Sequence, residues 1–278
     1  MPSWLKRMQQ SVNGDLIVRE RRVCLPKWPG PLDGLRIAHV SDLHFLRWNS
    51  AIEQAQQTLA HLPCDLIAAT GDFCMSRRSF KISVELVRRF FMPLHAPLGI
   101  FGVLGNHDPP CMEVHMADTP LQLIDGQVCT VQANGAALNL VGVGVNGRKR
   151  RDLLDKTMGR RDPHAPTIVL THYPSTVRHV RPYRPDLVLS GHTHGGQVRF
   201  PWLGCVFPHD AIHPTKAYGL NNVNGVWLHV TAGVGTTGPF DVRINCPPEI
   251  TLLHLHRQSV PQDGAPSRTS CPKAQLLR

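Results

Sequence analysis

Short apolar runs recur along the chain from Leu35 onward, and each of them stops abruptly at a polar or small residue. Five of these runs have the length of a strand and lie at 35–41, 65–70, 99–104, 167–170 and 186–190. Runs of this length that do not alternate with polar residues are typical of buried strands in a parallel sheet. Two segments with helical spacing of apolar residues, at 51–62 and 80–91, separate the first three runs. This alternation predicts an α/β fold.

The remaining segments predict additional strands on the same scaffold. Strand-like pieces at 127–132 and 137–145 flank Asn134-Gly135, a dipeptide that favours a two-residue hairpin turn. Further strands are predicted at 225–231 and 250–256, and a short helix at 153–158. The segment 201–208 is apolar but begins and ends with proline, so we expect no regular element there.

The pattern divides the chain into three parts. Residues 1–34 form an N-terminal extension whose strand, at 16–23, is expected at a sheet edge. Residues 35–256 contain all the other predicted strands and form the main domain. Residues 257–278 are polar and are expected to be a disordered tail.

Composition places the protein among globular chains. Of its 278 residues, 42% are hydrophobic, which is enough to build a packed core. No stretch approaches the roughly 18 to 20 apolar residues of a membrane helix, and the first 30 residues are too polar for a signal peptide. The eight cysteines form no C-x-x-C pair, which fits reduced thiols. We therefore expect a cytoplasmic protein.

The net charge of +10 is concentrated near the two ends of the chain. Residues 1–30 hold six Lys or Arg against two acids, and residues 257–278 hold four against one. Such charge suits nucleic acid, anionic lipid or a phosphorylated substrate. A basic nucleic-acid-binding protein is therefore an alternative, but no aromatic residues interleave with Arg148-Lys149-Arg150-Arg151 as in a single-strand binder, and we expect no specific nucleic acid. The N-terminal segment suits peripheral contact with an anionic membrane at its inner face.

The residues that follow the five apolar runs carry the candidate chemistry. Each run is followed by Asp, Asn or His: Asp42 and His44, Asp72, Asn106 and His107, His172, and finally His192 and His194. Turn residues also follow strands by chance. Ligands in open α/β sheets nevertheless gather outside the carboxyl ends of the strands, so these side chains are expected to converge. Oxygen and imidazole ligands without thiolates suit Mn, Fe, Zn or Co.

This number of ligands favours two divalent ions over one. Two ions about 3.5 to 4 Å apart can hold both the attacking and the leaving oxygen of a phosphoryl transfer. We expect a dinuclear centre, with manganese preferred. Four further histidines lie inside strand-like runs and are predicted to be structural: His39, His229, His254 and His256.

The order and spacing of these blocks resemble a known family. The blocks Asp42-x-His44, Gly71-Asp72, Gly105-Asn106-His107-Asp108, His172 and Gly191-His192-x-His194 resemble those of the calcineurin-like metallophosphoesterases. The resemblance covers roughly residues 35–256. The glycine-rich stretch 191–197 and the segment 245–250 resemble the bacterial branch of membrane-associated phosphodiesterases and lipid-sugar nucleotide pyrophosphatases.

The resemblance implies a fold and a set of ligands. The fold would be a four-layer αββα sandwich. One metal would be held by Asp42, His44 and His194, and the other by Asn106, His172 and His192. Asp72 would bridge both metals, because a carboxylate between two cations offsets their repulsion.

The resemblance also implies a mechanism. A metal-bound hydroxide would attack phosphorus in line, so no separate base is needed. His107 would contact the scissile phosphate or the leaving-group oxygen. Asp108 would orient His107, with an ordinary turn role as the alternative.

The implied substrate is a phosphoester: a phosphodiester or a pyrophosphate, on a lipid-linked molecule such as UDP-diacylglucosamine. The apolar loop 201–208 would offer Trp202, Leu203 and Phe207 to an acyl chain, with packing on its own core as the alternative. Two departures from the family pattern, Met75 and the stretch 142–147, concern specificity. A catalytically silent scaffold is the remaining alternative, although every ligand position is filled. The oligomeric state is not indicated.

Overall fold

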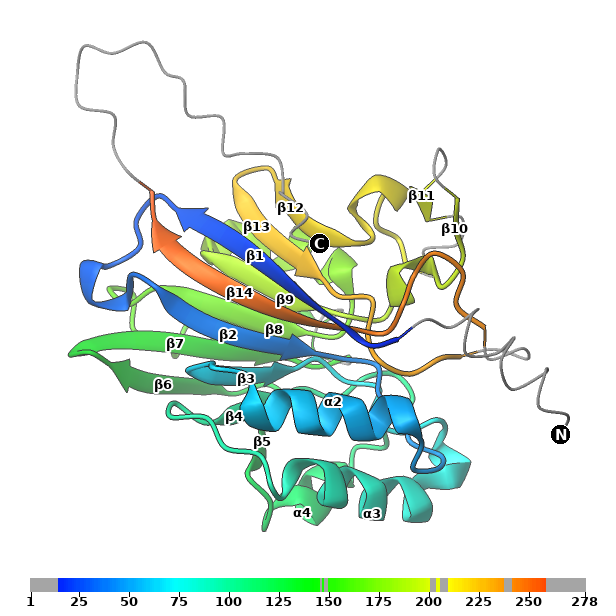
Figure 1. The fold of residues 1–278 in the computed structure, drawn as a ribbon. Coiled ribbons are helices and arrows are strands. Elements are labelled where there is room, and N and C mark those ends of the chain that lie inside the picture. Colours follow the sequence, from blue (N-terminus) through cyan, green and yellow to red (C-terminus); the bar gives the residue numbers. More distant parts are fainter. Residues whose placement is uncertain are drawn as a thin grey trace, which may run out of the picture.

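Two six-stranded sheets pack face to face, and helices cover their outer faces (Figure 1). The computed structural model describes residues 15–145, 147, 150–200, 204–205, 210–237 and 242–258. The expected four-layer αββα sandwich is confirmed by this arrangement. The predicted tail at 259–278 lies outside the described residues, as do residues 1–14 of the predicted extension.

The first sheet joins the N-terminal strand to the first half of the main domain. Its order is β1 (Ile17–Leu25), β14 (Glu249–Arg257), β2 (Leu35–Val40), β3 (Leu66–Ala69), β4 (Ile100–Gly102) and β5 (Leu121–Leu123). All neighbours are parallel except β14 and β2. The strand expected at 16–23 is present as β1 at the edge, where Val23 and Leu25 are buried in the core.

The second sheet contains the hairpin and the strand that precedes the two predicted ligand histidines. Its order is β12 (Gly219–Val223), β13 (Val226–Val230), β9 (Leu187–Ser190), β8 (Thr167–Thr171), β7 (Ala136–Val143) and β6 (Val128–Ala133). Positive φ angles of 51° at Asn134 and 81° at Gly135 make the tight turn between β6 and β7. The predicted hairpin is confirmed.

One expectation about regular structure is wrong. A two-stranded ribbon of β10 (Arg199–Phe200) and β11 (Gly204–Cys205) enters the segment 201–208. Neither Pro201 nor Pro208 is among the paired residues, so the prolines remove no hydrogen bond from this ribbon. Residues 201–203 and 206–209 lie outside the described residues.

The helices form the two outer layers. The α-helices are α2 (Ser50–His61), α3 (Phe80–Phe91), α4 (Met112–Met116), α5 (Arg151–Met158) and α6 (Val177–Val180). Short 3-10 helices lie at Gly30–Leu32, Arg77–Ser79, Pro174–Thr176, Arg181–Tyr183, His194–Gly196 and Pro214–Lys216. None of the helices in the described ranges combines the length and hydropathy needed to cross a bilayer.

Three hydrophobic clusters correspond to the three interfaces between layers. Ile52, Ala55 and Leu59 of α2 pack with the first sheet, as their helical spacing predicts. Leu140 and Leu170 of the second sheet meet Ile37 of the first in the central cluster. The third cluster joins the second sheet to α5 and α6. The central cluster holds the two sheets, and therefore their strand ends, in a fixed relation.

The four histidines predicted to be structural make contacts within or between strands. His39 of β2 and His229 of β13 meet between the sheets with their Nδ1 atoms 2.9 Å apart, and His39 Nε2 lies 2.9 Å from Thr70 Oγ1. His254 contacts Glu20, and His256 contacts Asp33. None of the four contacts the predicted metal ligands.

Half of the basic stretch at 148–151 is paired. Arg150 forms an ion pair with Asp152, and Arg151 forms one with Asp155. Arg148 and Lys149 lie outside the described residues. Arg150, which precedes α5, and Arg151, its first residue, are therefore both paired with acids of this helix.

The buried His39–His229 pair predicts a pH dependence of stability. Burial lowers the pKa of His39 to about 3, and burial followed by the neighbouring His39 lowers the pKa of His229 well below its usual value. In the unfolded chain both titrate at about pH 6.5, so below that pH the unfolded state binds protons that the folded state does not. Stability should therefore fall as pH decreases from about 6.5.

We expect His229→Gln to reduce the slope of the free energy of unfolding against pH by about 1 kcal/mol per pH unit. The measurement is the free energy of unfolding in urea at pH 7.5 and pH 5.5, on metal-free protein. Every other histidine is common to the two proteins, so an identical pH dependence would contradict the prediction.

Candidate metal centre

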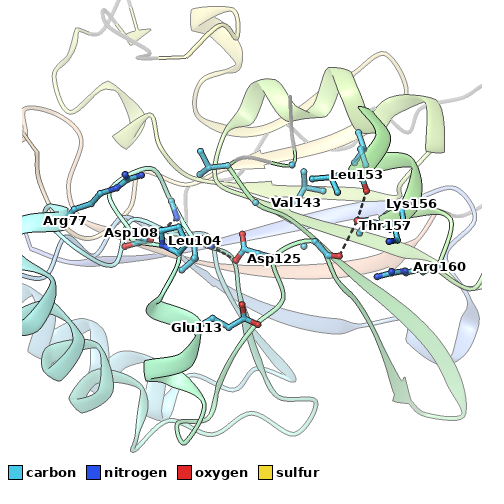
Figure 2. Close-up of a pocket in the computed structure, with 18 residues that line it drawn as sticks. Arg77, Leu104, Asp108, Glu113, Asp125, Val143, Leu153, Lys156, Thr157 and Arg160 are labelled. Carbon is cyan, nitrogen blue, oxygen red and sulfur yellow. Dashed lines mark hydrogen bonds between the residues drawn. The ribbon is translucent and has the colours of Figure 1, made fainter. Parts of the chain in front are cut away.

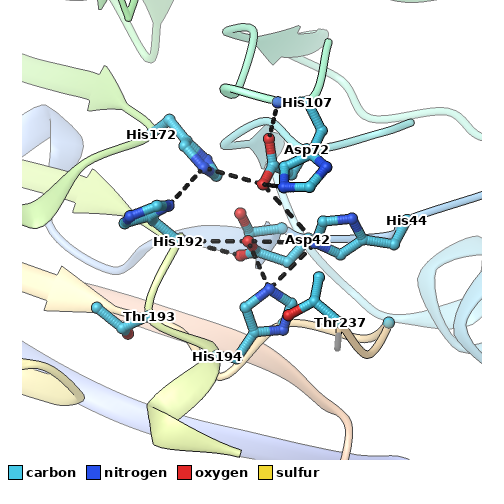
Figure 3. A network of polar contacts seen from close by, with 12 residues as sticks. Asp42, His44, Asp72, His107, His172, His192, Thr193, His194 and Thr237 are labelled. Atoms are coloured by element: carbon cyan, nitrogen blue, oxygen red, sulfur yellow. Dashed lines mark hydrogen bonds and ion pairs between the residues drawn. The ribbon is translucent and has the colours of Figure 1, made fainter. Parts of the chain in front are cut away.

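The carboxyl ends of five strands from both sheets meet at one edge of the sandwich. Strands β2, β3 and β4 of the first sheet and β8 and β9 of the second all end there, because each group runs parallel. The loops are tied to one another: Asp42 N–H donates to Gly71 O at 2.9 Å, and His44 N–H donates to Asp72 O at 3.0 Å. The seven predicted metal ligands converge at this edge, and Figure 3 labels six of them.

One group of ligands comes from the ends of β2 and β9. The ligand atoms of Asp42, His44 and His194 all lie within 4.8 Å of one another, and all three residues are buried. His44 Nε2 lies 3.1 Å from His194 Nε2, which is 3.4 Å from Asp42 Oδ1. These are the residues predicted for the first metal.

A second group comes from β3, β8 and β9. The ligand atoms of Asp72, His172 and His192 also lie within 4.8 Å of one another. Asn106 Oδ1 and His192 Nδ1 each lie 3.1 Å from His172 Nε2. Asp72 Oδ2 is 3.2 Å from His172 Nε2 and 3.7 Å from His44 Nε2. Asp72 therefore lies between the two groups.

Hydrogen bonds behind the rings set which nitrogen faces the centre. His44 Nδ1 lies 3.2 Å from Cys74 O, and His172 Nδ1 lies 2.8 Å from Thr70 O. A carbonyl oxygen only accepts, so each Nδ1 carries the proton and donates it. When the rings are neutral, their Nε2 lone pairs point at the centre, as metal-binding histidines require. Two imidazole nitrogens 3.1 Å apart, beside two carboxylates, fit a cation between them.

The charges at the centre are consistent with bound cations. Burial raises the pKa of Asp42 to about 7. Burial opposes ionisation of Asp72 too, but the positive charge of His172 outweighs it and holds the pKa of Asp72 well below its usual range. Burial lowers the pKa of His172, yet the Asp72 carboxylate outweighs that effect and raises it to about 9. The buried carboxylates thus draw a positive charge, here a proton, into the site.

The backbone at the centre adopts an uncommon conformation. Five of the predicted ligands have φ between 46° and 69°: Asp42, His44, Asp72, His192 and His194. A non-glycine residue in this region costs of order 1 to 3 kcal/mol, and such residues cluster at functional sites. Asp and His tolerate the conformation better than β-branched residues do. The strand-end loops therefore turn sharply enough to aim their side chains into one crevice.

Two glycines are required by the close packing of the carboxylates. A Cβ on Gly191 would overlap the Ser41 hydroxyl and the Asp42 carboxylate, and a Cβ on Gly105 would overlap Asp72. These glycines belong to the blocks Gly191-His192 and Gly105-Asn106. Their role is to let the ligand loops approach the carboxylates.

His107 lies at the border of the centre, and Asp108 accepts hydrogen bonds from the backbone of the ligand loops. His107 Nδ1 donates to Met75 O at 2.7 Å, and its Nε2 lies 4.0 Å from Asp72 Oδ2. The Asp108 carboxylate accepts backbone N–H groups of Phe73, Cys74 and Gly105 instead of contacting the His107 ring. The carbonyl of Met75 thus orients the ring, and the expected orientation by Asp108 is corrected.

A buried arginine that sequence reasoning missed supports Asp42. The Arg243 guanidinium donates to the carbonyls of Ala232 at 2.8 Å and Gly233 at 3.2 Å, and it also contacts Gly235 O. Gly235 N–H in turn donates to Asp42 O at 2.7 Å. Arg243 is fully buried, but in the sequence it resembles any loop arginine. In the sequence, its only distinguishing feature is that it lies close to the segment 245–250, which resembles the bacterial branch of the family.

The part of the chain that carries the ligands matches a known protein family. The model of the calcineurin-like phosphoesterase family matches residues 35–196, which include all seven predicted metal ligands. The chain belongs to this family. Proteins of this family use divalent metals, and the two ligand groups described above are candidate sites for them. The chain is a metal-dependent phosphoesterase.

Similar proteins have related activities in their names. UDP-2,3-diacylglucosamine pyrophosphatase LpxG of Chlamydia trachomatis serovar D is 29% identical, over 82% of this phosphoesterase and 86% of LpxG. Phosphodiesterase YaeI of Escherichia coli K12 is 30% identical, over 79% and 82%. One crystal structure with 10% identity superposes with a TM-score of 0.52, over 72% of this chain and 91% of its own, a likeness in fold alone.

The packing around Gly191 generates a prediction. In Gly191→Ala the new methyl group would displace the Asp42 carboxylate, so we expect divalent metal to bind roughly 10- to 100-fold more weakly while the fold is kept. Metal content by mass spectrometry and circular dichroism measure the two effects. The control is Gly30→Ala, where a Cβ meets nothing within 4 Å. Equal metal affinity in the two variants would contradict the prediction.

Proposed function

We propose that this phosphoesterase hydrolyses a phosphodiester or pyrophosphate bond with two divalent ions held by its two ligand groups. The observation that carries the proposal is the position of Asp72, whose Oδ2 is 3.2 Å from His172 and 3.7 Å from His44. One carboxylate within reach of both groups suits a bridging ligand, because an anion between two cations offsets their repulsion.

The ligand assignment follows the two groups. Asp42, His44 and His194 would hold the first ion, and Asn106, His172 and His192 the second, with Asp72 shared. Oxygen and imidazole ligands without thiolate favour manganese, iron, zinc or cobalt, and we propose manganese. When bound, the two ions supply Lewis-acid activation of water and of the phosphoryl oxygens.

The chain's own contribution to the reaction is assigned to His107. Its side chain is 36% exposed, so it is accessible to a substrate at the centre. With Nδ1 donating to Met75 O, its Nε2 is directed toward the site. In the protonated form, Nε2 can donate to the leaving-group oxygen as that oxygen gains charge. Asp108 acts as a positioning residue, because it holds the loops after β3 and β4 together.

The natural substrate that we favour is lipid-linked. The support is the similarity to LpxG, whose name gives UDP-2,3-diacylglucosamine as its substrate. Contact of the basic N-terminal segment with an anionic membrane would bring the enzyme to such a substrate. The predicted acyl rim of Trp202, Leu203 and Phe207 lies outside the described residues, as does the N-terminal stretch 1–14.

The bridging role of Asp72 predicts a joint loss of both metals. Asp72→Asn should leave fewer than one ion per chain and no measurable activity, because the neutral amide cannot offset the repulsion between two cations. Metal analysis and hydrolysis of bis(p-nitrophenyl) phosphate with Mn²⁺ test this. The control is Asp33→Asn, because Asp33 lies before the amino end of β2, away from the ligands. This variant should keep both its metal content and its activity. If Asp72→Asn retained two ions, the proposal that Asp72 is shared by both ions would be contradicted.

The role of His107 predicts a different outcome. His107→Ala should keep two ions and lose about 10²- to 10⁴-fold in kcat, since only proton transfer is removed. His95→Ala, at an exposed position, is the matched control. Loss of metal in His107→Ala would place this residue among the ligands instead. Wild-type protein that binds two ions and cleaves no phosphoester would support the silent-scaffold alternative.

A further inference from the structure

A cavity beside the metal centre has no role in the mechanism proposed above (Figure 2). Its volume is about 380 Å³, within the range of roughly 300 to 1,000 Å³ that small-molecule sites occupy. Leu104 lines it from the loop after β4, Val143 from β7, and Leu153 and Leu154 from α5. The walls are therefore mainly apolar.

The cavity and the centre share one loop. Gly105 and Asp108 line the cavity, while Asn106 and His107 lie between them and face the ligand groups. A group attached to a phosphate at the centre would reach the cavity across this loop. The cavity is thus placed to receive a substituent of the substrate.

Three carboxyl groups, those of Asp108, Glu113 and Asp125, interrupt the apolar wall. Asp125 lines the cavity, and its Oδ2 accepts the Leu104 N–H at 2.9 Å. Removal from water raises the pKa of Asp125 to about 7. A carboxylate has about four acceptor positions, and the N–H groups of Leu104 and of Asp125 itself leave part of this capacity for a ligand. An alkyl chain in this cavity would leave them without a donor, whereas a hydroxyl group would supply one.

Three cations lie at the edge of the same cavity. Arg77, Lys156 and Arg160 line it with exposed side chains, and they form no ion pair with any described residue. In the same region Arg150 and Arg151 are both paired with acids of α5. The unpaired cations are therefore available to an anionic group such as a second phosphate.

We propose that this cavity binds the ribose of a nucleotide substrate, with a ribose hydroxyl donating to Asp125. The apolar side chains would face the ring carbons, and the cations at the edge would hold a phosphate not undergoing cleavage. A carboxylate that accepts ribose hydroxyls is a common solution in nucleotide sites. This proposal rests on the proposed function, because it places the scissile phosphate at the metal centre.

The hydroxyl contact is tested by binding, independently of turnover. Uridine 5′-monophosphate and its 2′,3′-dideoxy analogue are titrated calorimetrically into the Mn²⁺-loaded protein. We expect the dideoxy analogue to bind roughly tenfold more weakly to the wild type, the effect of one lost hydrogen bond to an acidic group. In Asp125→Asn the remaining oxygen accepts Leu104 N–H, so the ratio of the two dissociation constants should fall toward one.

The Asp33→Asn variant serves as control and should keep the wild-type ratio. Equal affinities for the two nucleotides in the wild type, or an unchanged ratio in Asp125→Asn, would overturn the proposal. Hydrolysis of bis(p-nitrophenyl) phosphate by the wild type, which needs no ribose subsite, tests the proposed function separately.

The location is tested by filling the cavity. Leu153→Trp should weaken binding of uridine 5′-monophosphate at least tenfold and leave inorganic phosphate unchanged, since phosphate alone occupies only the metal centre. Ile82→Trp, on the exposed face of α3, is the matched control because it does not line the cavity. If Leu153→Trp weakened octyl phosphate and spared the nucleotide, the cavity would bind an alkyl chain and the ribose proposal would fail.

Discussion

Two carboxylates removed from water at the meeting point of two sheets are the constraint on which the rest of this structure depends. Asp42 and Asp72 are both at most 2% exposed. Burying two like charges in one site is strongly unfavourable unless cations or protons compensate. This need is seen in two pKa values. Burial raises the pKa of Asp42 to about 7, and the Asp72 carboxylate is the main group that raises the pKa of His172 to about 9. Metal ions satisfy the same need and add Lewis acidity.

The strained loops are held by groups that do not themselves face the centre. Positive φ angles at five ligands disfavour the folded state, and this cost must be offset by packing around them. Arg243 offsets part of it by gathering the carbonyls of the loop that bonds to Asp42. Its guanidinium is fully buried, yet its hydrogen-bonding capacity is met by backbone oxygens. Asp108 does the same for the loops after β3 and β4.

The strands and the ligands could be predicted from the sequence because both follow from local pattern. Buried parallel strands leave unbroken apolar runs, and ligand residues directly follow them, as at Asp72 and His172. The roles of Cys74 and Met75 could not be predicted, because each contributes a backbone carbonyl, and every residue type has one. β12 was missed because Gly219–Val223 has only two separated apolar residues, Leu220 and Val223, and pairs only with β13. The contact of Asp125 with the loop after β4 spans two elements and has no local signal.

The loop at 104–108 links the chemistry to the choice of substrate. Its polar residues Asn106 and His107 face the ligand groups, while Leu104, Gly105 and Asp108 line the cavity. Asp125 bonds to the first residue of this loop, and Asp108 bonds to the neighbouring loop after β3. Any substrate group that displaced Asp125 would therefore shift the backbone that carries His107. Recognition in the cavity and proton donation at the centre would therefore be coupled through the four residues 104–107. The fit of the substrate group bound in the cavity would then affect kcat as well as binding.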